Sequence, residues 1–237
     1  MSTSEPGVWF GDAADARALA RECNEYFARL TADRPTRWGW FATLPLPDVD
    51  GALAEITYAF DTLKADGACL MTSYMGKYLG DPVFAPVMDE LNRRRAVVYT
   101  HPFRGESMVS LLPDGRALGI TLTTETTLTI ASVLSSGTVA RCPDIRFIWS
   151  HGGGTMPYIT SRLGAGTLPG STEPNPTLKA IQRFYYDTAQ AFNPYTLASL
   201  TRLVPASHLL FGTDYPFAQA GRSEEHTSEL QSRGLIS

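Results

Sequence analysis

The chain of 237 residues has few cysteines, little net charge and no long apolar run, and each scarcity excludes a class of protein. Its three cysteines include no CxxC pair, which argues against a disulfide frame or a zinc knuckle and predicts thiols in a reducing compartment. A net charge of −4 gives no basic footprint for nucleic acid. No apolar stretch approaches the about 20 residues of a membrane span, and no secretory signal is visible. We therefore expect a cytoplasmic protein that binds neither membrane nor nucleic acid.

What the sequence does contain is a regular alternation of strand and helix patterns, which predicts an α/β architecture with a parallel sheet. Apolar residues at three- and four-residue spacing predict helices. These helices are expected over residues 12–32, 48–67, 82–95, 123–139, 156–163 and 194–203. Short apolar runs predict strands over residues 38–44, 68–72, 97–100, 146–150, 184–186 and 209–213, with 8–10 as a candidate seventh. Residues 164–175, rich in Gly, Pro, Thr and Ser, are expected to form a loop over the site.

Ionisable side chains come directly after four of the expected strands. They are His101, His151, Asp187 and Asp214. A (β/α)₈ barrel of the TIM type gathers the C-terminal ends of its parallel strands at one mouth, where its active site lies. Packing alone does not require an ionisable group at the same position after each of four strands. At each single position, a hydrogen-bonded histidine at the rim or an aspartate that caps a turn is the simpler alternative. The pattern therefore predicts a barrel whose mouth holds one metal ion or one substrate. Imidazole and carboxylate ligands suit zinc, manganese or iron.

The C-terminal end of the chain differs from the rest of the sequence. Residues 222–232 read as the in-frame translation of a common sequencing-adapter string, so we expect residues 222–237 to be a non-native tail. A native polar tail is the alternative. Residues 1–221 are then expected to form one barrel domain, and His226 is excluded as a ligand.

Four segments resemble the decarboxylating branch of the amidohydrolase superfamily, which includes aminocarboxymuconate-semialdehyde, γ-resorcylate and 6-methylsalicylate decarboxylases. They are Trp149-Ser-His-Gly-Gly-Gly154, Phe211-Gly-Thr-Asp-Tyr-Pro-Phe217, Thr100-His-Pro102 and Ala42-Thr-Leu-Pro45. The resemblance runs in order over about residues 7–218. It implies a metal-dependent, non-oxidative decarboxylase of a small aromatic or muconate-type carboxylic acid. Homodimers or larger homo-oligomers are usual in this family.

The resemblance also implies roles for single residues. His101 and Asp214 match ligands of a divalent metal, zinc or manganese, and His151 matches a catalytic acid/base; Asp214 can also act as a proton donor. The first strand of the family carries a His-x-His or Glu-x-His pair, and nothing in this sequence matches it. We therefore expect the first strand and the last helix to be missing, and metal binding and turnover to be weak.

Further residues are candidates for substrate contact or for support of the site. Arg104 and Arg162 are candidate partners of a substrate carboxylate by charge, and Glu125 and Asp187 are candidates for substrate binding or for orienting the site. Residues 152–154, all glycine, are expected to let the backbone approach the substrate and to open an anion-binding helix. His208, at the start of a strand, is expected to be structural.

Two alternatives remain open from the sequence. One is a metal-dependent hydrolase of the same superfamily, such as a lactonase, which would use the same metal and base to attack a carbonyl. The other is a non-catalytic fragment or binding protein, which the unmatched ligand pair favours.

Overall fold

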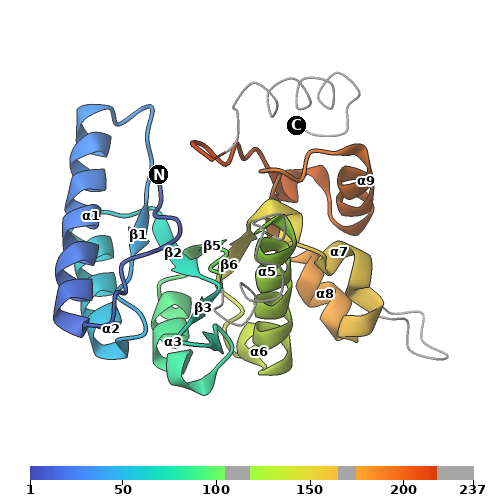
Figure 1. Cartoon of the computed structure of the whole chain (residues 1–237), viewed down its shortest axis with the longest axis horizontal. Helices are drawn as coiled ribbons and strands as arrows, with labels where there is room; N and C mark the ends of the chain where they lie inside the picture. The colour runs from blue at the N-terminus through green and yellow to red at the C-terminus, as the bar shows by residue number, and fades with distance from the viewer. Residues whose placement is uncertain (105–117, 165–174, 218–237) are drawn as a thin grey trace.

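The computed structural model describes residues 1–104, 118–164 and 175–217, and six parallel strands form its main sheet (Figure 1). The order across the sheet is β1-β2-β5-β6-β7-β8, and every neighbouring pair is parallel. These strands are β1 (Phe41–Thr43), β2 (Gly67–Met71), β5 (Val97–His101), β6 (Arg146–Trp149), β7 (Tyr185–Asp187) and β8 (Leu209–Leu210). A separate antiparallel hairpin pairs β3 (Ser73–Tyr74) with β4 (Lys77–Tyr78).

Helices connect the strands and cover the sheet. In Figure 1, α1 and α2 lie at the left edge of the molecule and α8 and α9 at the right, with the strands between them. The α-helices are α1 (Ala13–Asp33), α2 (Val49–Thr57), α3 (Ala85–Arg93), α5 (Leu118–Ser135), α6 (Thr138–Arg141), α7 (Met156–Ile159), α8 (Pro176–Gln182) and α9 (Pro194–Leu203). Short helical turns are η1 (Tyr58–Thr62), η2 (Pro82–Phe84), η3 (His151–Gly153), η4 (Thr160–Leu163) and η5 (Ala206–His208).

Helix α1 forms where its sequence supplies both a cap and a buried face. The Asp12 side chain accepts a hydrogen bond from the backbone N–H of Asp15, which satisfies one of the free donors of the first turn. Ala16, Ala20 and Asn24 lie on one face at four-residue spacing, and all three are buried. The helix thus packs its small side chains inward.

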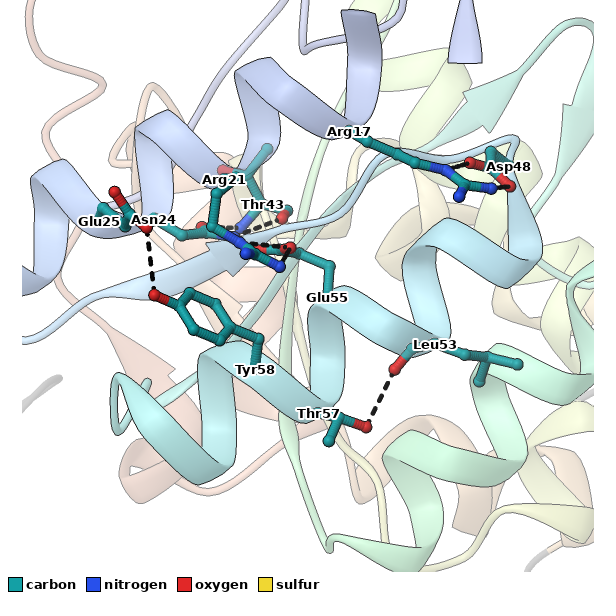
Figure 2. Close-up of polar contacts among 10 residues, drawn as sticks. All are labelled: Arg17, Arg21, Asn24, Glu25, Thr43, Asp48, Leu53, Glu55, Thr57 and Tyr58. Carbon is teal, nitrogen blue, oxygen red and sulfur yellow. Dashed lines mark hydrogen bonds and ion pairs between the residues drawn. The ribbon is translucent and has the colours of Figure 1, made fainter. Parts of the chain in front are cut away.

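A polar cluster connects α1, α2 and β1 (Figure 2). The guanidinium of Arg21 on α1 donates to the Glu55 carboxylate on α2, with a shortest distance of 2.7 Å. The Asn24 amide accepts from the Thr43 N–H at 2.7 Å and donates to the Thr43 carbonyl at 2.9 Å and to Glu55 at 2.9 Å. Asn24, Thr43 and Glu55 are all less than 5% exposed, so these contacts satisfy groups that water does not reach. The cluster fixes the outer edge of β1 to the helix that covers it.

The hydrophobic core lies between the sheet and its helices. Its largest fully buried side chains include Trp149, Tyr186, Phe84 and Phe147. The rings of Phe147 and Trp149 on β6 stack with centroids 5.2 Å apart, and Phe184 meets both edge-on. This core packs around β6 and the start of β7, below the strand ends that carry the candidate site.

The architecture confirms the expectation of a parallel α/β barrel fold, with six strands at the expected places. Three details differ. Residues 8–10 form no strand, and β1 and β8 are shorter than expected. The sequence pattern also did not predict the β3–β4 hairpin or helix α8. Most of the expected loop over residues 164–175, and the whole expected tail over residues 222–237, lie outside the described residues. Within the described part of the chain, no helix is both long and apolar enough to cross a membrane.

Candidate active site

Three of the expected site residues converge at the C-terminal ends of the strands. His101 is the last residue of β5, His151 follows β6 by two residues, and Asp214 follows the end of β8 by four. The rings of His101 and His151 meet edge-on with centroids 6.2 Å apart. The His151 Nε2 atom lies 3.8 Å from the Asp214 Oδ2 atom, which is the distance of an ion pair rather than of a hydrogen bond. Residues 50 and 63 positions apart in the sequence thus meet at one mouth, as the strand-end pattern predicts.

These three residues open onto a cavity of about 590 Å³. Its described lining is Glu5, Pro6, His101, Arg104, Leu118, Leu122, His151, Gln190, Asp214 and Phe217. His101, Gln190 and Asp214 come from strand ends or the loops after them, as does His151. Leu118 and Leu122 of α5 and Phe217 add apolar surface. A cavity of this size with a few convergent polar groups is typical of small-molecule sites.

The two histidines have opposite electrostatic environments. Burial, and then the charge of His151, lowers the pKa of His101, so His101 favours its neutral form. Its Nδ1 lies 2.9 Å from the Pro102 carbonyl, which only accepts hydrogen bonds, so Nδ1 carries the proton and Nε2 keeps a free lone pair. Burial alone would lower the pKa of His151, but the carboxylates of Asp214 and Asp187 outweigh burial and raise it. His101 is therefore suited to bind a metal ion through Nε2, and His151 is suited to donate a proton.

Asp214 is held as an ionised carboxylate. Burial alone would raise its pKa, but contacts from His151 and Gln190 outweigh burial and lower it. The Gln190 Nε2 atom donates to Oδ2 of Asp214, the same oxygen that faces His151. Asp214 thus presents an anionic oxygen between an amide donor and an imidazole.

Two side chains at the cavity have donor atoms that suit a divalent metal. The neutral Nε2 of His101 and the ionised carboxylate of Asp214 are suitable ligand atoms. A catalytic site needs about three protein ligands and an open position. Among the described residues, no group of three or more His, Cys, Asp or Glu side chains is arranged to hold a metal ion. The described residues thus provide part of a metal centre and not a complete one.

Arg104 also lines the cavity, where it pairs with Glu5, a residue that the sequence analysis did not predict to be part of the site. Its Nε donates to the Glu5 carboxylate at 2.8 and 3.0 Å, and its side chain remains about half exposed. Glu5 lies 99 positions away in a loop, and no local pattern marks it. Gln190 was missed for a similar reason, although it belongs to the loop that directly follows β7.

Asp187 and Glu125, expected to bind substrate or to orient the site, are not among the described residues that line the cavity. Asp187 is 5% exposed, and protein donors occupy both of its oxygens. Glu125 is 1% exposed on α5, and its carboxylate accepts from the Tyr78 hydroxyl at 3.3 Å. Burial raises the pKa of both carboxyl groups. Neither carboxylate belongs to the described lining, so we carry forward for both residues the role of orienting the site.

Two further expectations concern Arg162 and His208. Arg162 lies in η4 and is not among the described residues that line the cavity. His208 is structural as expected: its Nδ1 lies 3.0 Å from the Phe184 carbonyl, and its ring stacks on Tyr185.

The run of three glycines serves close packing rather than an anion-binding helix. All three have positive φ, and the helix that follows, α7, has only four residues. A Cβ on Gly152 would lie 2.9 Å from that of Ala191, and one on Gly154 would lie 2.1 Å from the Thr123 carbonyl oxygen. The glycines bring the loop after β6 against its protein neighbours.

Comparisons with known proteins agree with this geometry. The model of the Amidohydrolase family matches residues 3–231. A 6-methylsalicylic acid decarboxylase from Penicillium expansum is 39% identical over 232 residues, which cover 92% of this chain and 70% of that protein.

Solved structures share the fold. The crystal structure of 2,6-dihydroxybenzoate decarboxylase from Rhizobium superposes with a TM-score of 0.82 at 25% identity, over 95% of this chain and 75% of that one. A dihydroxybenzoic acid decarboxylase from Polaromonas sp. JS666, solved with bound manganese, has the same TM-score at 24% identity and covers 95% of this chain and 73% of its own.

Proposed function

The chain belongs to the amidohydrolase family, and we propose that it is a metal-dependent, non-oxidative decarboxylase of a small aromatic carboxylic acid. The observation that carries the proposal is the convergence of His101, His151 and Asp214 on one cavity at the C-terminal mouth. Its curated relatives include decarboxylases, among them the 6-methylsalicylic acid enzyme. A muconate-type acid is the other substrate class that the family suggests.

We assign roles to four of the residues that line the cavity. His101 and Asp214 would hold a divalent metal, zinc or manganese, which would supply Lewis-acid chemistry to the substrate carboxylate or an adjacent oxygen. His151 is the acid/base, and the Asp214 carboxylate, 3.8 Å from its Nε2, favours the protonated imidazole. Arg104 contacts the substrate carboxylate with those guanidinium N–H groups that Glu5 does not occupy.

The reaction requires one proton and releases CO₂. The bond between the carboxyl carbon and the ring carbon breaks, and its electron pair takes up a proton at the ring carbon. His151 holds that proton at Nε2, and the neighbouring Asp214 carboxylate stabilises the imidazolium before transfer. The apolar surface of Leu118, Leu122 and Phe217 contacts the ring and limits access of water.

The test is CO₂ release from 6-methylsalicylate and 2,6-dihydroxybenzoate by the purified chain with added manganese or zinc. We expect the corresponding phenol and CO₂ in equal amounts. Substitution His151→Ala should lower kcat about 10²–10⁴-fold while metal content stays unchanged. His101→Ala and Asp214→Asn should remove both metal and activity. Opening of a pyrone ring without CO₂ release would identify a hydrolase instead, and an unaffected His151→Ala enzyme would contradict the assigned acid.

A matched pair of arginine variants tests the substrate contact. Arg104→Ala should raise KM for the carboxylate substrate because the cavity loses its cation. Arg162→Ala, on η4 away from the described lining, is the control and should leave KM unchanged. Equal KM values in the two variants would count against the role of Arg104.

We also propose a reducing compartment, the cytoplasm, and self-association of the chain. The three cysteines Cys23, Cys69 and Cys142 are all free thiols, which suits such a compartment. Exposed aromatic rings at Tyr158, Tyr195 and Tyr215 provide surface that a homodimer could bury. Light scattering on the purified chain, at several concentrations, measures the oligomeric state.

A further inference from the structure

The buried carboxylate of Asp187 is the one strand-end group of the original pattern that the proposed reaction does not use. It lies at the end of β7, is 5% exposed, and has three protein partners. Its Oδ1 accepts the backbone N–H of His151 at 2.8 Å and that of Ala189 at 3.1 Å. Its Oδ2 accepts the hydroxyl of Tyr99, on β5, at 3.0 Å. One side chain thus joins the ends of β5, β6 and β7.

The residue that Asp187 holds has a strained backbone. His151 has φ +53°, in the left-handed region that side-chain-bearing residues rarely adopt. Such a conformation is strained and persists only where the surroundings fix it. A charged acceptor is well suited to this task because hydrogen bonds to carboxylates are roughly twice as strong as neutral ones.

The imidazole of His151 has little else to orient it. Its Nδ1 is buried and has no hydrogen-bond partner among the described residues. Its Nε2 faces Asp214 at 3.8 Å, which is too long for a hydrogen bond. The direction of the ring therefore depends on where the backbone places its Cα–Cβ bond.

We propose that Asp187 is the positioning residue for His151: its carboxylate holds the His151 backbone in the left-handed conformation that directs Nε2 towards Asp214, without touching the substrate. The inference rests on the proposed role of His151 as the acid/base. It assigns to β7 a function in the reaction that is separate from the metal ligands.

A double-mutant cycle separates this role from a general loss of structure. Asp187→Ala should lower kcat at least ~10-fold in the wild-type background, with KM within about threefold, because proton transfer is sensitive to geometry. In the His151→Ala background the same substitution should change kcat by less than about twofold, since its target is gone. Additive effects of the two substitutions would overturn the proposal. So would a loss in Asp187→Ala that appears in KM alone.

Two conservative variants provide controls for folding. Asp187→Asn keeps an oxygen acceptor for the His151 N–H, so it should recover at least ~10-fold of the activity lost in Asp187→Ala. Tyr99→Phe removes only the hydroxyl that binds Oδ2 and should stay within about threefold of wild type. An Asp187→Asn enzyme no better than Asp187→Ala would argue against a hydrogen-bonding role.

A measurement without turnover keeps this test distinct from the proposed function. The chain has four histidines, so ¹⁵N-histidine labelling gives four backbone amide signals by NMR. The amide of His151 should exchange with solvent at least ~10-fold faster in Asp187→Ala than in wild type, while that of His208 should not change. Equal exchange of the His151 amide in both proteins would overturn the proposal. Absence of CO₂ release with the expected exchange result would refute only the proposed reaction.

Discussion

Three side-chain-bearing residues at the cavity have left-handed backbones: His151 (φ +53°), Gln190 (φ +51°) and Asp214 (φ +56°). Each lies in the loop after a different strand, and together they form the His151–Asp214–Gln190 contact. Residues in such conformations each cost on the order of 1–3 kcal/mol. The core below the strand ends must therefore supply the rigidity that keeps them in place.

The glycines beside His151 are needed for the same geometry. Gly154 has φ +67°, and a Cβ there would lie 2.1 Å from the Thr123 carbonyl oxygen. We expect Gly154→Ala to destabilise the protein by at least about 2 kcal/mol because backbone strain and steric overlap act together. The midpoint of urea unfolding measures the change.

Gly119 is the matched control for this substitution. It lies within α5, has no φ in the left-handed region, and a Cβ there would meet nothing within 4 Å. Gly119→Ala should be neutral or stabilise the protein by up to about 1 kcal/mol, since alanine is the better helix former. Similar destabilisation by both substitutions would show that the close approach at Gly154 is not the cause.

At the scale of elements, the connection of α1 to β1 depends on one buried amide. Asn24 is 0% exposed and pairs with both backbone groups of Thr43 and with Glu55. Asn24→Ala leaves those groups without their partner, and each buried unsatisfied group costs about 1–3 kcal/mol. We expect a loss of at least ~2 kcal/mol in the free energy of unfolding. Glu22→Ala, at an exposed position on the same helix, should change it by less than about 0.5 kcal/mol.

Helix α3 carries an acid-sensitive ion pair. Hydrogen bonds from Arg93, and then from Arg94, outweigh burial and lower the pKa of Glu90 from 4.5 to about 2. A carboxyl group whose pKa is lower in the folded state contributes stability above its unfolded pKa and loses it as pH falls through its folded pKa.

Glu90→Gln should therefore weaken the dependence of stability on pH between about 4.5 and 2. Urea midpoints measured from pH 6 to pH 2.5 should fall less for Glu90→Gln than for wild type. Glu22→Gln, at an exposed position on α1, is the control and should follow the wild type. Parallel curves for wild type and Glu90→Gln would show that the pair adds no acid-dependent stability.

The sequence predicts elements well where a long periodic pattern carries its own cap, and poorly where elements are short. Helix α1 and its Asp12 cap follow the expected bounds within one residue at each end. Helix α8 has only seven residues and one buried side chain, Ile181, so its periodicity is weak despite the Pro at its first turn. The β3–β4 hairpin has two residues a strand, and only its turn residues Met75 and Gly76, both with positive φ, mark it.

The candidate site also contains residues that the sequence pattern predicts and residues that it does not. His101, His151 and Asp214 were predictable because parallel strands bring their C-terminal ends to one side of the sheet. Glu5 and Gln190 were not, because loops place them and no repeat fixes their direction. Asp187 follows from the same strand-end argument, which left open whether it binds substrate or orients the site. A strand end fixes position along the sheet, not whether the carboxylate reaches the cavity.

At the scale of the whole molecule, a bound cation would join distant parts of the chain. His101 ends β5 and Asp214 follows β8, and two strands lie between them in the sheet. A ligand that binds only the folded state stabilises it by RT ln(1 + [L]/Kd), which is about 2.7 kcal/mol at 100 times Kd. We expect manganese or zinc to raise Tm by a few degrees or more under that condition.

Two histidine variants check that the thermal effect belongs to the site. His101→Ala should abolish the metal-dependent rise in Tm. His208→Ala should lower Tm, because His208 stacks on Tyr185, but it should keep the rise. A rise that persists in His101→Ala would place the metal elsewhere on the protein.

The pairing of Asn24 with Thr43 also bears on how the protein avoids association through its sheet. The N–H of Phe41 binds the Met1 carbonyl, and the N–H and C=O of Thr43 bind the Asn24 amide. The outer edge of β1 thus offers no free donor at either residue to an incoming strand, and exposed strand edges are templates for aggregation. Partial detachment of α1 would uncover this edge while the rest of the sheet stays folded. Heat-induced aggregation is therefore expected to begin with α1, before the protein unfolds as a whole.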